Sequence, residues 1–172
     1  MSKGYVHVYA GNGKGKTTAA LGRAMRAAGA GMRVFIAQFV KGRDYSELHS
    51  FAKLSEQITL KQYGKKCFIY SNPEMDDVLA ARQGLEEVRQ AVSSGSYELV
   101  VLDEANIATY YKLFSVDELL EIIDAKPEHV ELVVTGRYAD DRIIDRADLV
   151  TEMLEVKHYY TQGVPARAGI ES

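Results

Sequence analysis

A glycine-rich stretch near the amino terminus has the residue types and spacing of a phosphate-binding loop. Residues 6–18 read VHVYAGNGKGKTT, an apolar run that leads into alternating Gly11, Gly13 and Gly15 and then Lys16-Thr17-Thr18. This is the Walker A pattern with Ala10 at its first glycine position. Glycines without a Cβ let successive backbone N–H groups turn inward toward an anion. The lysine ammonium then reaches the outer phosphates and the Thr17 hydroxyl holds Mg²⁺, so the stretch predicts a nucleoside triphosphate site.

Two other interpretations fit parts of this stretch. A glycine-rich turn between a strand and a helix can be only a tight connection that binds nothing. The dinucleotide fingerprint GxGxxG, begun at Gly11, requires glycine at the position that Lys16 occupies. We therefore set the Rossmann interpretation aside and keep the triphosphate site as the prediction.

An acidic pair follows a second apolar run. Residues 97–104 read YELVVLDE, which predicts a buried strand that delivers Asp103 and Glu104 at its carboxyl end. In phosphate-loop proteins an acidic residue at this Walker B position reaches Mg²⁺ directly or through water. A strand that simply exits on Asp-Glu has the same sequence, and either carboxylate can be the direct ligand.

An arginine comes just after another predicted strand. Residues 130–134 form the apolar run, and Thr135-Gly136-Arg137 follows it. In a parallel sheet this position faces the same edge as the phosphate-binding loop, so Arg137 is a candidate phosphate contact. A surface arginine fits the pattern equally well.

Alternating apolar strands and amphipathic helices must position these motifs. The predicted strands start at Val6 and lie at 33–39, 58–63, 97–104, 130–134 and 149–156. Helices are expected after the phosphate-binding loop, within 40–66, from Asn72-Pro73 to about Ser93, from Ser115 to Pro127 and over 140–149. Asn72 is the expected N-cap with Pro73 as first helical residue, and Ser115 with Glu118 reads as a capping box. The alternation predicts an α/β fold of RecA-like phosphate-loop type, with a mainly parallel sheet flanked by helices, as one domain over residues 1–172.

The segment from Val40 to Lys66 is locally basic and is followed by aromatic side chains. It is either a solvated surface or a binding loop beyond the carboxyl end of the second strand, where open α/β sheets place ligands. Three aromatic side chains and one thiol in this region either cover a flat apolar ligand or pack in the core: Tyr63, Cys67, Phe68 and Tyr70.

The bulk composition excludes several classes of protein. The 172 residues are 47% hydrophobic and 26% charged with a net charge of -3, which describes a globular protein without the basic field that attracts nucleic acid. One cysteine excludes an internal disulfide, and no apolar run approaches the roughly 20 residues needed to span a bilayer. We expect a cytoplasmic protein that does not bind nucleic acid or membranes.

Taken together, the motifs resemble the phosphate-loop ATP:corrinoid adenosyltransferases. The matching segments are GNGKGKTT at 11–18, QFVKG at 38–42, LDE at 102–104, TGR at 135–137, ADLVTEM at 147–153, KH at 157–158 and GIE at 169–171. They run along nearly the whole chain.

The resemblance implies transfer of the 5′-deoxyadenosyl group of ATP to the Co(I) of a reduced corrinoid, with triphosphate as leaving group, in cobalamin biosynthesis. It implies Lys16 and Glu104 as catalytic residues, and Thr17, Asp103 and Glu104 around Mg²⁺. The implied ligand contacts are Gly11, Asn12, Gly13, Lys14, Gly15, Lys16, Thr17, Thr18 and Arg137 for ATP, and Phe68 for the corrin. It also implies a homodimer and an unidentified reductant. Because Co(I) is itself the nucleophile, no residue need activate one, in keeping with a sequence that shows no obvious general-base constellation.

Two other functions share the Walker motifs. An ordinary phosphate-loop kinase or ATPase releases ADP instead of triphosphate. A non-catalytic ATP- and corrinoid-binding protein holds both ligands without alkylating cobalt.

Overall fold

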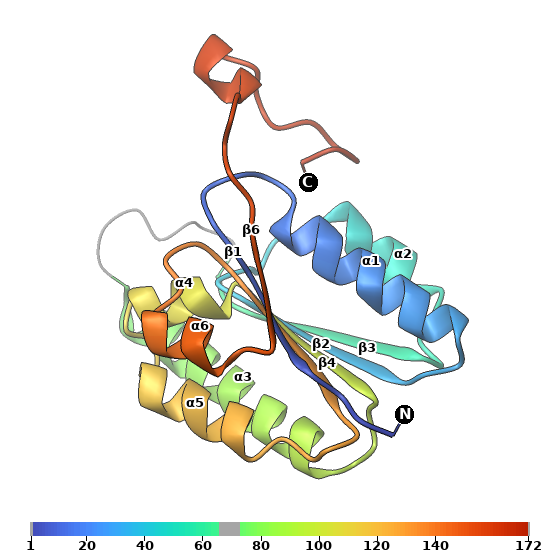
Figure 1. The fold of residues 1–172 in the computed structure, drawn as a ribbon. Helices are drawn as coiled ribbons and strands as arrows, with labels where there is room; N and C mark the ends of the chain where they lie inside the picture. Colours follow the sequence, from blue (N-terminus) through green and yellow to red (C-terminus); the bar gives the residue numbers. More distant parts are fainter. Residues whose placement is uncertain (1, 66–72, 172) are drawn as a thin grey trace.

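A single parallel sheet organises the part of the chain that the structure describes. The computed structural model describes residues 2–65 and 73–171, and within them six strands pair in the order β3-β2-β4-β5-β1-β6 (Figure 1). The strands are β1 Val6–Ala10, β2 Val34–Phe39, β3 Ile58–Tyr63, β4 Leu99–Asp103, β5 Glu131–Thr135 and β6 Leu149–Glu152. Every pairing is parallel, so all carboxyl ends meet at one edge. The predicted α/β class and parallel sheet are confirmed.

Helices cover both faces of this sheet. The helices are α1 Lys16–Gly29, α2 Ser46–Ala52, α3 Met75–Ser93, α4 Ala105–Tyr110, α5 Val116–Asp124 and α6 Asp141–Arg146, with a 3₁₀ turn at Tyr159–Gln162. In Figure 1, α1 and α2 lie on one face and α3 to α6 on the other. Two apolar clusters result, one under each layer. The residues of β2 and β4 are all buried, which explains why these strands read as continuous rather than alternating apolar runs.

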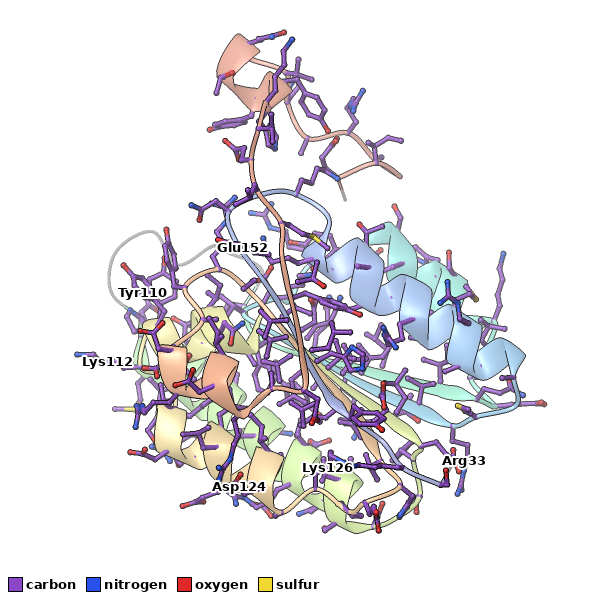
Figure 2. All side chains as sticks on the ribbon, viewed as in Figure 1. Arg33, Tyr110, Lys112, Asp124, Lys126 and Glu152 are labelled. Atoms are coloured by element: carbon purple, nitrogen blue, oxygen red, sulfur yellow. The ribbon has the colours of Figure 1, made fainter. Side chains whose placement is uncertain are left out.

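Two predicted boundaries are wrong. Helix α3 begins at Met75, not at Pro73, because Glu74 is the N-cap and forms a reciprocal capping box with Asp77; Asn72 lies outside the described residues. The last strand ends at Glu152, although the sequence predicted a strand to residue 156. Figure 2 labels Glu152 at this point, where the chain leaves the sheet and passes the phosphate-binding loop. The short helix α4 was not predicted, whereas the Ser115 and Glu118 capping box at the start of α5 is confirmed.

Candidate active site

The phosphate-binding loop joins β1 to α1 at the carboxyl edge of the sheet. Gly15 is the N-cap of α1 with a left-handed φ of 115°, and Gly11 has φ 91°. The Lys16 side chain folds back over the loop, and its ammonium donates to the carbonyl oxygens of Gly11 at 2.7 Å and Gly13 at 2.8 Å. Burial lowers the pKa of Lys16 below that of a free lysine. The loop thus surrounds one cation at the N-terminus of a helix, which is the arrangement that binds phosphate.

The backbone after β6 explains two of the loop glycines. The Gly13 N–H donates to the Met153 carbonyl at 2.6 Å, and the Met153 N–H donates to the Ala10 carbonyl at 2.9 Å. A Cβ on Gly11 would lie 2.4 Å from the Met153 oxygen, and one on Gly13 would lie 2.7 Å from the Leu154 oxygen. Gly13, unlike Gly11 and Gly15, does not have a positive φ. Its requirement is the close approach of another segment.

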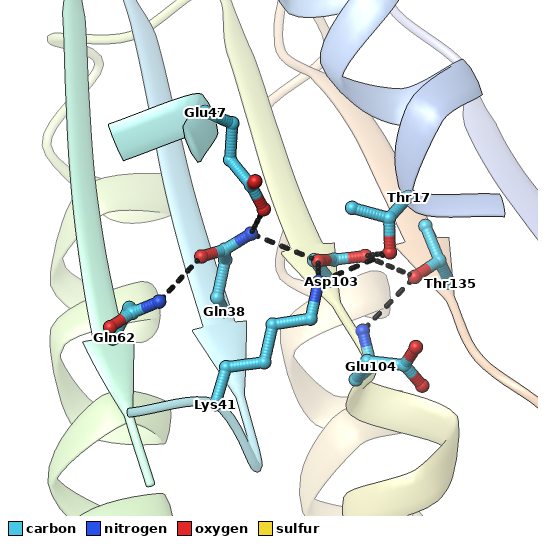
Figure 3. Close-up of polar contacts among 8 residues, drawn as sticks. All are labelled: Thr17, Gln38, Lys41, Glu47, Gln62, Asp103, Glu104 and Thr135. Atoms are coloured by element: carbon cyan, nitrogen blue, oxygen red, sulfur yellow. Dashed lines mark hydrogen bonds and ion pairs between the residues drawn. The ribbon is translucent and has the colours of Figure 1, made fainter. Parts of the chain in front are cut away.

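Asp103 is the centre of a buried polar network at the end of β4. The residue is 0% exposed. Its Oδ1 accepts from the hydroxyls of Thr17 at 2.9 Å and Thr135 at 2.7 Å. Its Oδ2 accepts from the Lys41 ammonium at 2.8 Å and the Gln38 amide at 3.3 Å (Figure 3). The Thr17 hydroxyl therefore lies beside Asp103, as the Walker motifs predicted.

Sheet register brings the amide part of this network together. Gln38 on β2 is the lateral partner of Asp103 on β4 and of Gln62 on β3. The Gln62 amide donates to the Gln38 side-chain oxygen at 3.1 Å, and the Gln38 amide also donates to Glu47 at 3.2 Å. Gln38 is 0% exposed, so this chain of hydrogen bonds satisfies a polar side chain that burial would otherwise penalise.

Glu104 differs from Asp103 in its surroundings. Its backbone is left-handed (φ 60°, ψ 20°), and its N–H donates to the Thr135 hydroxyl at 3.0 Å. The carboxylate accepts no hydrogen bond from residues 2–65 or 73–171, and it is partly buried. Burial, with the neighbouring charge of Asp103, raises the pKa of Glu104. A left-handed non-glycine residue costs on the order of 1–3 kcal/mol and is enriched at functional sites.

Lys41 forms an ion pair with Asp103. Burial alone would lower the pKa of Lys41, but the charge of Asp103 and the hydrogen bond to it outweigh burial, and the pKa is raised. Lys41 is therefore charged and paired at neutral pH.

The other predicted site residues divide into three groups. Asn12, Lys14 and Thr18 are exposed on the loop or the first turn of α1, and the Lys14 ammonium donates to the Ile170 carbonyl at 3.3 Å. Arg137 is exposed after β5, close enough for its charge to influence the pKa values of Lys16 and Glu104. Phe68 lies outside the described residues, as do Cys67 and Tyr70.

Tyr63 belongs to the core rather than to a ligand surface. It is 5% exposed, its ring packs 5.8 Å from that of Phe39, and its hydroxyl donates to Glu87 at 2.9 Å. Of the two interpretations of this aromatic residue, the structure bears out the core one.

Three contact residues of Asp103 were not assigned a role from the sequence, namely Gln38, Lys41 and Thr135. A signal was present for Gln38, because one amide interrupts the buried apolar run RVFIAQF. Buried polar side chains need partners, so that position pointed to a polar network.

The oxygen atoms at this edge suit Mg²⁺. The described residues contain no cluster of three or more His, Cys, Asp or Glu side chains able to hold a metal by themselves. Mg²⁺, however, is usually bound by one or two protein oxygens together with substrate phosphates and water. The Thr17 hydroxyl and the Glu104 carboxylate provide hard oxygen ligands of that kind, so the residues fit a magnesium ion that arrives with a nucleotide.

A parallel sheet with a Walker A loop after its first strand and an acidic pair at the end of β4 defines a RecA-like phosphate-loop protein. The fold is similar to that of a KaiC-like protein from the archaeon Pyrococcus horikoshii, with a TM-score of 0.59 at 17% identity over 87% of this chain and 73% of that one. Within this class, the chain belongs to the ATP:corrinoid adenosyltransferase BtuR/CobO/CobP family, whose profile matches residues 2–172. It is a transferase by that membership.

Curated relatives agree with this assignment. A corrinoid adenosyltransferase from Pseudomonas aeruginosa is 36% identical over 98% of this chain and 84% of its own length. Those of Escherichia coli K12 and Salmonella typhimurium are 31% and 32% identical, each over 98% of this chain and 86% of their own length. Among the described residues, no helix combines the length and apolar character that crossing a bilayer requires.

Proposed function

We propose that this chain transfers the 5′-deoxyadenosyl group of ATP to the Co(I) centre of a reduced corrinoid and releases triphosphate. The observation that carries the proposal is the meeting of four family motifs at one carboxylate. Thr17 of the loop, Lys41 of QFVKG and Thr135 of TGR all contact Asp103 of LDE. Segments far apart in the chain therefore build one site, beside the loop expected to hold the triphosphate.

In the proposed mechanism the protein binds and orients ATP and stabilises charge on the leaving group. The carbon–oxygen bond at C5′ of the ribose breaks as the cobalt–carbon bond forms, and the electron pair of the broken bond leaves with the triphosphate. The N-terminal amides of α1, Lys16 and Arg137 would neutralise that growing charge, with Asn12, Lys14 and Thr18 as further contacts to the nucleotide. Gly11, Gly13 and Gly15 keep the loop free of side chains.

We assign the magnesium site to Thr17 and Glu104. The bound ion would supply positive charge to the phosphate oxygens. Glu104 would hold this ion with its carboxylate, which accepts no hydrogen bond from the described residues. Asp103 would orient the Thr17 hydroxyl, to which it is bonded at 2.9 Å.

The remaining expectations are part of the same proposal. Residues 1–172 act as one domain in a cytoplasmic enzyme that works as a homodimer in cobalamin biosynthesis. A separate reductant supplies Co(I), because the proposed step consumes the reduced corrinoid and generates none. The family resemblance supports these points.

One observation favours a second candidate, ATP hydrolysis. Glu104 follows the Walker B aspartate, its carboxylate accepts no hydrogen bond from the described residues, and its pKa is raised; these are properties of a general base. A water molecule activated by Glu104 would attack the γ-phosphate and release ADP and phosphate.

Turnover with both substrates separates these candidates. The protein is incubated anaerobically with ATP, Mg²⁺ and chemically reduced corrinoid, and the visible spectrum is followed before and after illumination. A light-sensitive alkylcobalt spectrum that needs protein and ATP supports the transferase. ADP formed without an alkylated corrinoid would favour the hydrolase, and binding of both ligands without any spectral change would favour a carrier. A Lys53→Ala protein is a matched control, because Lys53 is exposed and lies between α2 and the start of β3, at the opposite edge of the sheet.

A further inference from the structure

The Lys41 ammonium occupies the corner between the two residues that phosphate-loop proteins use for magnesium. It lies 2.8 Å from Asp103 Oδ2 and 3.2 Å from Thr17 Oγ1 (Figure 3). In such proteins the loop Ser or Thr and the Walker B Asp hold the metal between them. Here a side-chain cation fills the space between these two groups.

The hydrogen bonds of Asp103 leave no position for a metal. A carboxylate has about four lone-pair sites. Within residues 2–65 and 73–171, Asp103 accepts from four donors, two at each oxygen, and it is 0% exposed. A divalent ion could reach it only by displacing Lys41 or by breaking the bonds to Thr17, Thr135 and Gln38.

The backbone after β2 is built to direct Lys41 to this corner. Val40 has φ 57°, a left-handed conformation that is rare and strained for a β-branched residue. A Cβ on Gly42 would lie 2.3 Å from the backbone oxygen of Gly64, and one on Gly64 would lie 2.6 Å from the backbone nitrogen of Lys41. The turn is therefore fixed by close backbone packing, and the Lys41 side chain is only 14% exposed.

The neighbouring carboxylate has the opposite character. The Glu104 carboxylate accepts no hydrogen bond from the described residues, and the Glu104 backbone N–H donates to the Thr135 hydroxyl at 3.0 Å. The Thr17 hydroxyl donates its hydrogen to Asp103 and accepts from Lys41, so one of its two lone pairs is still available. Thr17 and Glu104 are the oxygen donors that this network leaves accessible.

We propose that Lys41 is a positioning residue that reserves Asp103 for its own ammonium and thereby directs the divalent ion to Thr17 and Glu104. The inference rests on the proposed function only in taking magnesium and ATP as ligands of the site. The position of the Lys41 ammonium has a second, electrostatic effect. The ammonium cancels the charge of Asp103, which would otherwise repel a triphosphate bound at the loop.

Mn²⁺ in place of Mg²⁺ gives a direct test. The quantity measured is the metal coupling, which is the ratio of ATP affinity with Mn²⁺ to that with EDTA, from calorimetric titration. In otherwise unchanged protein, Glu104→Gln should reduce the coupling by about 10–100-fold, whereas Asp103→Asn should reduce it by less, because the asparagine amide oxygen can still accept from the Thr17 hydroxyl. In a Lys41→Met background, Asp103→Asn should reduce the coupling more than Glu104→Gln does, because Asp103 can then bind the metal ion.

A second measurement follows Mn²⁺ alone. Free Mn²⁺ has a strong paramagnetic resonance signal, so its loss on adding nucleotide-free protein reports binding. Lys41→Met should bind the ion about 10–100-fold more tightly than unchanged protein. The double variant with Asp103→Asn should lose that gain, and Lys53→Met, at an exposed lysine, should show none.

Defined results would overturn the inference. Asp103→Asn with a coupling as weak as that of Glu104→Gln would show that Asp103 is a direct ligand despite Lys41. An unchanged Mn²⁺ affinity in folded Lys41→Met would reduce Lys41 to a structural ion pair. If Lys41→Met does not fold, the comparison of Asp103→Asn with Glu104→Gln decides, because it keeps Lys41. None of these measurements uses corrinoid, so failure of the proposed adenosyl transfer would be seen separately.

Discussion

Thr135 gives the sharpest stability test of the buried network. Its side chain is 0% exposed, and its hydroxyl has two partners. It donates to Asp103 Oδ1 at 2.7 Å and accepts the Glu104 N–H at 3.0 Å. Thr135→Val keeps the shape of the side chain and removes both interactions, so it measures the hydroxyl with little change in packing.

The expected cost follows from these two contacts. A hydrogen bond to a charged group contributes about 1.5–3 kcal/mol, and a buried N–H left without a partner costs about 1–3 kcal/mol. Asp103 keeps three other donors, and the new methyl group buries apolar surface that returns about 0.8 kcal/mol. We therefore expect Thr135→Val to lower the free energy of unfolding by about 2–4 kcal/mol. Thr135→Ser keeps the hydroxyl and loses one methyl group, so it should cost only about 1 kcal/mol.

Urea unfolding followed by circular dichroism at neutral pH measures both variants. The midpoint of Thr135→Val should fall well below that of Thr135→Ser, at an unchanged dependence on denaturant. A serine variant as unstable as the valine variant would show that packing, not hydrogen bonding, sets the role of Thr135. A valine variant with an unfolding free energy within about 1 kcal/mol of the unchanged protein would refute the stabilisation assigned to the two hydrogen bonds of Thr135.

Three further predictions concern charged groups. Lys16→Ala should weaken ATP binding by roughly 10–100-fold in calorimetric titration, because one charge-assisted phosphate contact contributes about 1.5–3 kcal/mol. Glu104→Gln should lower adenosyl transfer by at least about tenfold and yet stabilise the fold by about 1 kcal/mol, or roughly 2–4 °C in Tm. The raised pKa of Glu104 means that ionising this carboxyl group costs folding free energy. His7 has a pKa lowered from 6.5 chiefly by burial, so the unfolded chain takes up a proton before the folded one. Stability should fall as pH drops below about 6.5, by at most about 1.4 kcal/mol per pH unit, and His7→Gln should flatten the slope.

Each of these predictions has a contrary outcome. ATP affinity retained in Lys16→Ala would remove the lysine from the phosphate site. A Glu104→Gln protein that melts below the unchanged protein would show that the carboxylate makes a stabilising contact. An identical pH slope in the His7→Gln variant, across the range from 7 to 5, would mean that His7 does not control acid stability.

The sequence predicted the fold well where one local pattern decided the structure. The buried runs of β2 and β4 read as strands because helices cover both faces of the sheet, and the loop before α1 followed from its glycines. The last strand was overextended, because Met153 leaves the sheet to bind the phosphate-binding loop. Apolar residues in that segment, such as Val156 at 93% exposed, extend a strand pattern that the backbone does not follow.

Individual residues of the candidate site could be predicted from sequence motifs, but the hydrogen bonds between them could not. Thr17, Asp103 and Glu104 come from known motifs, whereas the contacts of Gln38 and Thr135 with Asp103 depend on which strands are neighbours. That order is a long-range property that no local pattern contains. The position of Lys41 depends on the left-handed Val40, an unusual conformation for a β-branched residue and hence hidden from propensity arguments.

The fate of the three phosphates distinguishes adenosyl transfer from ATP hydrolysis. Phosphorus nuclear magnetic resonance of a reaction containing ATP, Mg²⁺ and reduced corrinoid distinguishes free triphosphate from ADP with phosphate. For adenosyl transfer we expect one triphosphate for each adenosylated corrinoid and no ADP beyond that of a protein-free control. ADP as the main phosphorus product, or alkylated corrinoid without triphosphate, would contradict it.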